Sequence, residues 1–161
     1  MPETFRVLRE LLSRVEKAGV VCGKLQTTVP TWALKEAEVM ARVGGSGLYK
    51  DFKLNKGVKY MNQSDLKQMY LANTWKPTLS VIGADGIPNI EVAGNVIRKS
   101  TTVKISFRTP PDYSPAKAFK VLQEKLTKNV PHNCKVELSK PLLGSGWSMR
   151  VPSDHMGQAF E

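Results

Sequence analysis

Apolar and polar residues alternate in three segments of the second half of the chain, and this spacing predicts three β-strands. The first is expected at residues 78–82, before the turn-forming run 83–86. The second is expected at residues 102–108, where Arg108 ends the polar face. The third is expected at residues 134–139. The apolar faces of the second and third strands would consist of Val103, Ile105, Phe107, Cys134, Val136 and Leu138.

Helical spacing of apolar residues predicts two amphipathic helices that flank these strands in the sequence. One is expected over residues 3–17, and Pro2 suits its first position. The other begins at Ser114, which is a good N-cap followed by a proline, and it ends before Pro131. The buried stripes would consist of Phe5, Leu8, Leu12 and Val15 in the first helix and of Phe119, Leu122 and Leu126 in the second.

The middle of the chain, residues 20–73, has no strong strand pattern and is expected to form an insertion. Thr31 can cap a helix that continues to about Arg42 and stops at a Gly-Gly pair. Asn62 or Ser64 can cap a shorter helix. The stretch between these two helices is rich in glycine and lysine and is expected to be a loop.

The order of elements is helix, insertion, strand, strand, helix, strand. This order predicts an α+β fold of the ferredoxin-like type (βαββαβ), with helices on one face of an antiparallel sheet and the first strand missing. Met1 precedes Pro2 where a capping residue is expected, which suggests a chain cut from something longer. The alternative is a natural start with a frayed first turn.

Composition narrows the functional classes. The chain has 161 residues, which suits one domain with a long insertion, and its net charge is +10. The positive charge permits nucleic-acid binding, but the densest lysines are separated by neutral or acidic residues, as on a solvated face. Two cysteines and the lack of a long apolar run favour a cytoplasmic protein without disulfides or membrane spans. The densest lysines are Lys50, Lys53, Lys56 and Lys59.

Few residues offer catalytic chemistry. The chain has two histidines, neither in a metal-binding motif, and no nucleophile or phosphate-loop signature. Arg108 is the candidate that the pattern itself selects, because it lies at the end of a strand before a rigid Pro-Pro pair. A planar guanidinium in that place can bind a carboxylate through two hydrogen bonds. The alternative is a surface arginine paired with a nearby acid.

Several segments in order resemble one enzyme family. They are residues 2–12 (PETFRVLRELL), 73–86 (NTWKPTLSVIGADG), 93–97 (AGNVI), 103–111 (VKISFRTPP), 145–147 and 153–155. Together they resemble the lid or dimerisation domain of the zinc metallopeptidases that include carnosine dipeptidase, aminoacylase, glutamate carboxypeptidase and acetylornithine deacetylase. The resemblance assigns residues 1–152 to that domain and residues 153–161 to the return into a catalytic domain that the chain lacks.

The resemblance also implies site residues and partners. Arg108 matches the arginine that binds the substrate carboxylate, and Asn95 matches a residue that contacts substrate in the neighbouring subunit. Two zinc ions belong to the catalytic domain of the same parent chain and none to this chain, which is not expected to be active alone. The substrate would be a peptide or acyl-amino acid with a free carboxylate. Homodimerisation would use the edge strand Thr78, Leu79, Ser80, Val81 and Ile82.

Two rival functions remain open. One is a stand-alone basic ferredoxin-like module that binds nucleic acid, which requires exposed aromatic residues on adjacent strands. Phe107 is expected on the apolar face instead. The other is a non-enzymatic scaffold. The resemblance favours neither a nucleic-acid partner nor a membrane.

Overall fold

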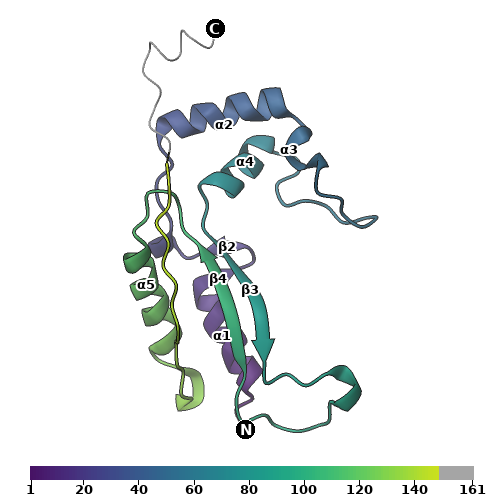
Figure 1. Ribbon diagram of the computed structural model, residues 1–161, viewed down its shortest axis with the longest axis vertical. Helices are drawn as coiled ribbons and strands as arrows, with labels where there is room; N and C mark the ends of the chain where they lie inside the picture. The colour runs from purple at the N-terminus through teal and green to yellow at the C-terminus, as the bar shows by residue number, and fades with distance from the viewer. Residues whose placement is uncertain (149–161) are drawn as a thin grey trace. The chain divides into compact units, whose positions relative to one another are not determined.

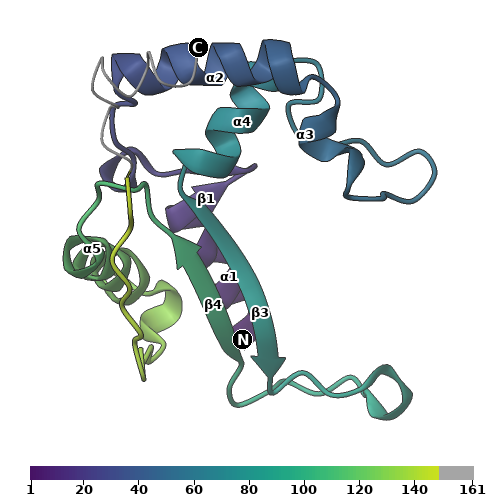
Figure 2. The same cartoon turned by 45° about the horizontal axis from the view of Figure 1, so that its top comes forward.

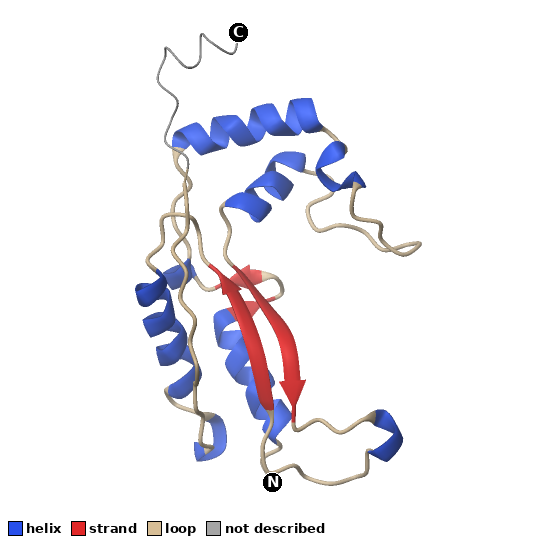
Figure 3. Cartoon of the chain, viewed as in Figure 1, coloured by secondary structure: helices blue, strands red, loops and turns tan. Residues whose placement is uncertain are grey.

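The computed structural model describes residues 1–148, so the prediction for residues 153–161 lies outside the described residues. The chain divides into two compact units (Figures 1 and 3). Residues 1–27 and 77–146 form the first unit, and residues 28–76 form the body of the second. The fold is α+β, as predicted, with two small antiparallel sheets of two strands each in the described part of the chain.

The first unit carries both sheets. Its strands form two hairpins, β1–β2 and β3–β4, and its two long helices are α1 and α5. In chain order the elements are α1 (Thr4–Val15), β1 (Glu16–Lys17), β2 (Val20–Val21), η1 (Gly23–Leu25), β3 (Thr78–Asp85), η2 (Ile90–Val92), β4 (Thr102–Arg108), α5 (Pro115–Thr127) and η3 (Pro131–Asn133).

The β3–β4 hairpin agrees with the predicted second strand and extends the predicted first one. Thr78 pairs with Arg108 at one end and Asp85 with Thr102 at the other, with a β-bulge between Val81 and Gly83. The first strand therefore continues past residue 82. The bulge keeps the strand paired with β4 where the sequence resembles a turn. The turn comes at Gly86, whose φ is +76° and whose missing Cβ would lie 2.7 Å from the carbonyl oxygen of Ser100.

The third predicted strand is not formed. Cys134, Val136 and Leu138 are half-buried and alternate with exposed residues, so the side chains follow the strand pattern. No hydrogen bond within the described chain uses a backbone N–H or C=O of residues 135–146. A strand needs a partner as well as an alternating sequence, and the described residues place none beside this segment.

The missing-cap prediction for α1 is wrong. Pro2 is not the first helical residue, because Glu3 is the N-cap. Its carboxylate accepts hydrogen bonds from the backbone N–H groups of Phe5 and Arg6 at 2.9 and 2.7 Å, and it forms an ion pair with Arg98 at 2.7 Å.

Replacing Glu3 with glutamine should make the fold less dependent on pH. The hydrogen bond from Phe5 N–H, followed by those from Arg6 N–H and Arg98, holds the pKa of Glu3 below its ordinary value. A carboxylate with a lowered pKa stabilises the fold at neutral pH, and this contribution is lost as the pH falls through the folded-state pKa.

Thermal melts of both proteins from pH 7 to pH 2.5 should therefore give a higher melting temperature for wild type than for Glu3→Gln at neutral pH. The two melting temperatures should converge as the solution becomes acidic. Glu10→Gln is the matched control on the same helix, since Glu10 is exposed and lies 3.5 Å from Arg14. A gap between wild type and Glu3→Gln that stays constant with pH would contradict the assigned cap.

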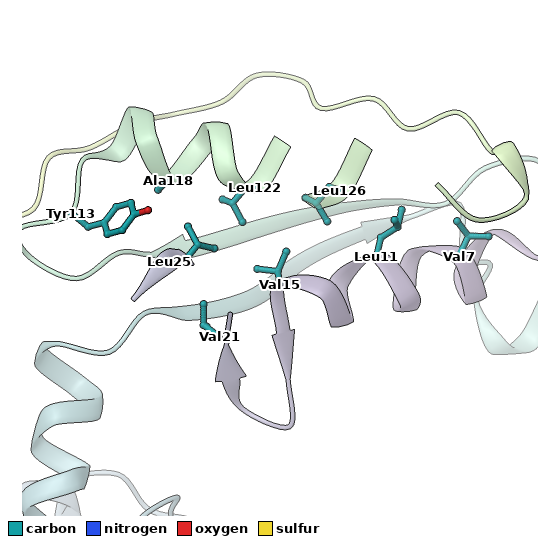
Figure 4. Packing of buried hydrophobic residues seen from close by; sticks show 9 residues of the cluster. All are labelled: Val7, Leu11, Val15, Val21, Leu25, Tyr113, Ala118, Leu122 and Leu126. Atoms are coloured by element: carbon teal, nitrogen blue, oxygen red, sulfur yellow. The ribbon is translucent and has the colours of Figure 1, made fainter. Parts of the chain in front are cut away.

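The core of the first unit lies between α1, α5 and the hairpins (Figure 4). The buried stripe of α1 differs from the predicted one, since Phe5 is 42% exposed and Leu8 and Leu12 are only half-buried. Two apolar stripes run along this helix, and packing against α5 selects the one with i, i+4, i+8 spacing. The cluster consists of Val7, Leu11, Val15, Val21, Leu25, Tyr113, Ala118, Leu122 and Leu126.

The second unit is helical. It contains α2 (Thr31–Gly44), α3 (Gly47–Lys50) and α4 (Leu66–Thr74), and it packs around Ala33, Ala37, Leu71 and Trp75. Trp32 meets Trp75 edge to face, with ring centroids 5.7 Å apart. No helix of the described chain is long and apolar enough to cross a membrane.

The predicted helix caps in this unit need correction. Pro30, not Thr31, precedes α2, and no side chain caps that end. Asp65, not Asn62 or Ser64, caps α4, because its carboxylate accepts the Gln68 N–H at 3.0 Å. The expected end of α2 is confirmed at Gly45, whose φ is +49°.

Candidate functional site

Arg108 stands exposed at the end of β4. The burial of β4 alternates along its whole length, so that Arg108 shares the exposed face with Thr102, Lys104 and Ser106. Within residues 1–148 its guanidinium forms no ion pair and no hydrogen bond. The next residue but one, Pro110, is fully buried and anchors the chain directly after the strand. The structure thus presents an exposed and uncompensated cation at one end of the hairpin.

Asn95 lies in the loop between β3 and β4, at the other end of the hairpin. A hydrogen bond of 2.8 Å from the Val96 N–H to the Gly94 carbonyl turns the backbone at Asn95, and the side chain is exposed. Because Arg108 pairs with Thr78 and the loop follows Asp85, the hairpin separates the two residues by about 20 Å. One chain therefore does not bring Arg108 and Asn95 to the same small ligand.

The loop that carries Asn95 is unusually apolar on its surface. Figures 1 and 2 show it extending beyond the end of the β3–β4 hairpin. An exposed run of aliphatic side chains in a loop indicates a contact with another surface. The exposed residues are Ile87, Ile90, Val92, Val96 and Ile97.

The edge of β3 that faces away from β4 is partly occupied. The Leu79 N–H donates to a carboxylate oxygen of Glu16 at 3.2 Å, so this group does not take part in the ladder with β4. Val81 and Ile82 are 49% and 57% exposed. Of the five residues predicted at a dimer interface, Leu79 is thus engaged by its own chain. The sequence gives no sign of this contact, because Glu16 and Leu79 are 63 residues apart.

Residues 1–148 do not offer a metal site. They contain no group of three histidine, cysteine, aspartate or glutamate side chains that could hold an ion. Zinc ions expected from the family resemblance would need ligands outside these residues. The two predicted substrate-binding residues, Arg108 and Asn95, both lie in the described chain and are exposed.

The described surface also bears on nucleic-acid binding. Lys50, Lys53, Lys56 and Lys59 are all exposed in the second unit. Phe107 is the one aromatic residue on β3 or β4, and it is half-buried against the core of the first unit. The hairpin therefore lacks a platform for stacking bases.

Comparisons with known proteins find a shared fold. No family model matches the sequence, and no curated protein matches it significantly. Among solved structures, an M20 family metallo-carboxypeptidase, Sso-CP2 from Sulfolobus solfataricus, matches with a TM-score of 0.53 and 18% identity over 80% of this chain. The dipeptidase Dug1p from Saccharomyces cerevisiae matches with a TM-score of 0.48 and 23% identity over 78% of this chain.

This chain spans 29% of the carboxypeptidase and 26% of the dipeptidase. The likeness to the carboxypeptidase concerns the fold. It is compatible with the predicted ferredoxin-like domain, and it connects the chain with part of a metallopeptidase structure rather than with a whole enzyme.

Proposed function

We propose that this chain is the dimerisation and substrate-capping domain of a zinc-dependent dipeptidase- or aminoacylase-like hydrolase. The observation that carries the proposal is the position of Arg108 and Asn95 at opposite ends of one hairpin with an exposed edge strand. Self-association through that edge would unite the two residues in one site. The fold shared with a metallo-carboxypeptidase supports the same assignment.

The geometry of a two-fold dimer follows from the strand direction. Two copies of β3 that pair across a two-fold axis run antiparallel, so the end of one strand lies beside the start of the other. The partner's loop after Asp85 then approaches the end where Arg108 pairs with Thr78. Asn95 of one subunit and Arg108 of the other would line a shared site.

The engaged Leu79 N–H defines where such pairing begins. Since Glu16 already satisfies this group, we place the contact at Val81 and the residues that follow it. This shift moves the two-fold axis toward Gly83. It also lets the partner's loop run past Thr78, and the aliphatic residues of the loop would be covered in the dimer.

The site formed in this way suits a substrate with a free carboxylate. A guanidinium binds a carboxylate through two parallel hydrogen bonds, and an asparagine amide can donate and accept one more. The two zinc ions and the hydrolytic groups would come from the catalytic domain of the parent chain. The lid would fix a peptide or acyl-amino acid in a productive orientation.

Replacing Ile82 with lysine should weaken the dimer at least about tenfold. With the axis near Gly83, two copies of residue 82 lie close together, and two lysines would bring like charges into the contact. Light scattering on a sizing column across a concentration series measures the change. Val43→Lys is the matched control, because Val43 is 76% exposed on α2. A wild-type chain that stays monomeric at high concentration would contradict the proposal.

A further inference from the structure

The loop between β3 and β4 has almost no buried surface of its own. Residues 86–97, 99 and 100 are all exposed, and they include the five aliphatic residues described above. Arg98 is the one residue of this loop that is half-buried. A loop with so few buried contacts keeps one position only if polar contacts hold it.

The base of the loop is closed where β3 ends and β4 begins. A Cβ added to Gly86 would lie 2.7 Å from the carbonyl oxygen of Ser100, so the two legs of the loop meet there. The Thr101 hydroxyl forms a hydrogen bond of 2.6 Å with the hydroxyl of Thr4 on α1. Figures 1 and 2 both show the start of α1 beside this end of the hairpin. These contacts hold the base, but none of them holds residues 87–97.

Arg98 makes the polar contact with α1 that lies closest to the tip of the loop. A terminal nitrogen of its guanidinium donates to a carboxylate oxygen of Glu3 at 2.7 Å, and the two side chains are only 30% and 32% exposed. The same carboxylate accepts the backbone N–H groups of Phe5 and Arg6. The next turn of this helix is fixed by Val7, which is buried in the core. A charged hydrogen bond in a partly buried place therefore joins the loop to a rigid helix end.

Asn95 lies three residues before this anchor. Three steps along the backbone span at most about 11 Å. The hydrogen bond from the Val96 N–H to the Gly94 carbonyl turns the chain at Asn95 and so shortens the span. Gly86, which closes the base on the other leg, is much further from Asn95 along the chain. The position of Asn95 relative to the hairpin thus depends more on Arg98 than on the base of the loop.

We propose that Arg98 is the positioning residue for Asn95: by binding Glu3, it holds the loop where Asn95 can enter the site of the neighbouring subunit. The role of Asn95 in that site rests on the proposed function, whereas the anchoring concerns this chain alone. Arg98 does not touch the substrate and acts only through Asn95. Without the anchor the loop would sample several positions, and Asn95 would occupy the productive one for a fraction of the time.

The first test measures the loop itself in the 161-residue chain. Arg98→Gln removes the cation, and nuclear magnetic resonance gives the backbone order parameters. We expect values of about 0.85 for residues 90–97 in wild type and below about 0.6 in the variant. Lys99→Gln is the matched control, because it removes the adjacent exposed cation and should leave the order parameters unchanged. Arg98→Lys should keep the loop ordered, since one terminal nitrogen makes the contact with Glu3.

Three results of this measurement would overturn the proposal. One is a loop that is already flexible in wild type. Another is a loop that stays as rigid in Arg98→Gln as in wild type. The third is an equal loss of order in Lys99→Gln, which would show that any change of charge in the loop has the same effect.

The second test uses the complete hydrolase that we propose. Arg98→Gln should lower kcat/KM about 2- to 10-fold, as the loss of one neutral hydrogen bond by Asn95→Ala would. Adding Arg98→Gln to Asn95→Ala should cause no further loss, because the first residue acts through the second. Independent, multiplying losses would overturn the positioning role. Full activity of Asn95→Ala would overturn the proposed function, and the order parameters would still decide whether Arg98 anchors the loop.

Discussion

Replacing Leu25 with alanine should destabilise the unit formed by residues 1–27 and 77–146 by about 2–5 kcal/mol. Leu25 has no exposed surface and is among the largest fully buried side chains of the described chain. It belongs to the cluster that joins α1, β2 and α5. Removing its branched end leaves a cavity that helices on both sides cannot easily close, and the lost contacts add to the lost transfer free energy.

Urea unfolding followed by circular dichroism measures this change, and hydrogen exchange of α1 and α5 assigns it to the first unit. Leu142→Ala is the matched control, since Leu142 is 95% exposed and its truncation should change stability by less than about 0.5 kcal/mol. Equal stability of the two variants would show that the cluster around Leu25 is not the core.

In the complete hydrolase that we propose, Arg108→Ala should lower kcat/KM about 10- to 100-fold, mainly through KM. Loss of a charged hydrogen-bonding partner leaves the substrate carboxylate unpaired in the closed site. Asn95→Ala should have a smaller effect, because one neutral hydrogen bond is lost. Steady-state kinetics on a peptide and on its carboxamide measure this change. The difference in kcat/KM between wild type and Arg108→Ala should be large with the peptide and small with the carboxamide, which has no carboxylate for Arg108 to bind.

Mixing these two variants tests whether the site is shared between subunits. After exchange, half of the dimers carry one subunit of each kind, and one of their two sites combines an intact Arg108 with an intact Asn95. Equal mixing should therefore restore about a quarter of the wild-type activity. In the control, the double variant is mixed equally with wild type, and exchange should lower the activity from half to about a quarter of the wild-type value, because every site of the mixed dimer lacks one residue. No recovery on mixing the single variants would contradict a shared site.

Local sequence accounts for the parts of the fold that were predicted well. Alternation alone gives the bounds of β4, and the pair Ser114-Pro115 gives the start of α5, since both signals act within a few residues. The buried side of α1 needed tertiary information, because Phe5 and Val7 begin two apolar stripes and only packing against α5 selects one. The predicted strand at 134–139 failed for the same reason, as its pattern is correct and its partner is absent from residues 1–148.

In the candidate site, too, local sequence predicts some features and tertiary structure decides the others. The exposure of Arg108 at a strand end could be predicted from its phase and from the prolines that follow. The separation of Arg108 from Asn95 depends on the register of β3 and β4 and on the length added by the bulge. The contact between Glu16 and Leu79 joins residues that are distant in the sequence, and no local pattern signals it.

The bulge and the Glu16 contact together limit how large an assembly of this chain can become. A long, flat and unoccupied edge strand accepts copy after copy and leads to fibres. In β3 the Glu16 carboxylate accepts the Leu79 N–H at one end of the edge, and the bulge between Val81 and Gly83 twists the rest of the strand. The stretch left over has room for one short neighbour. Assembly through this edge is therefore expected to stop at two subunits and to stay soluble as concentration rises.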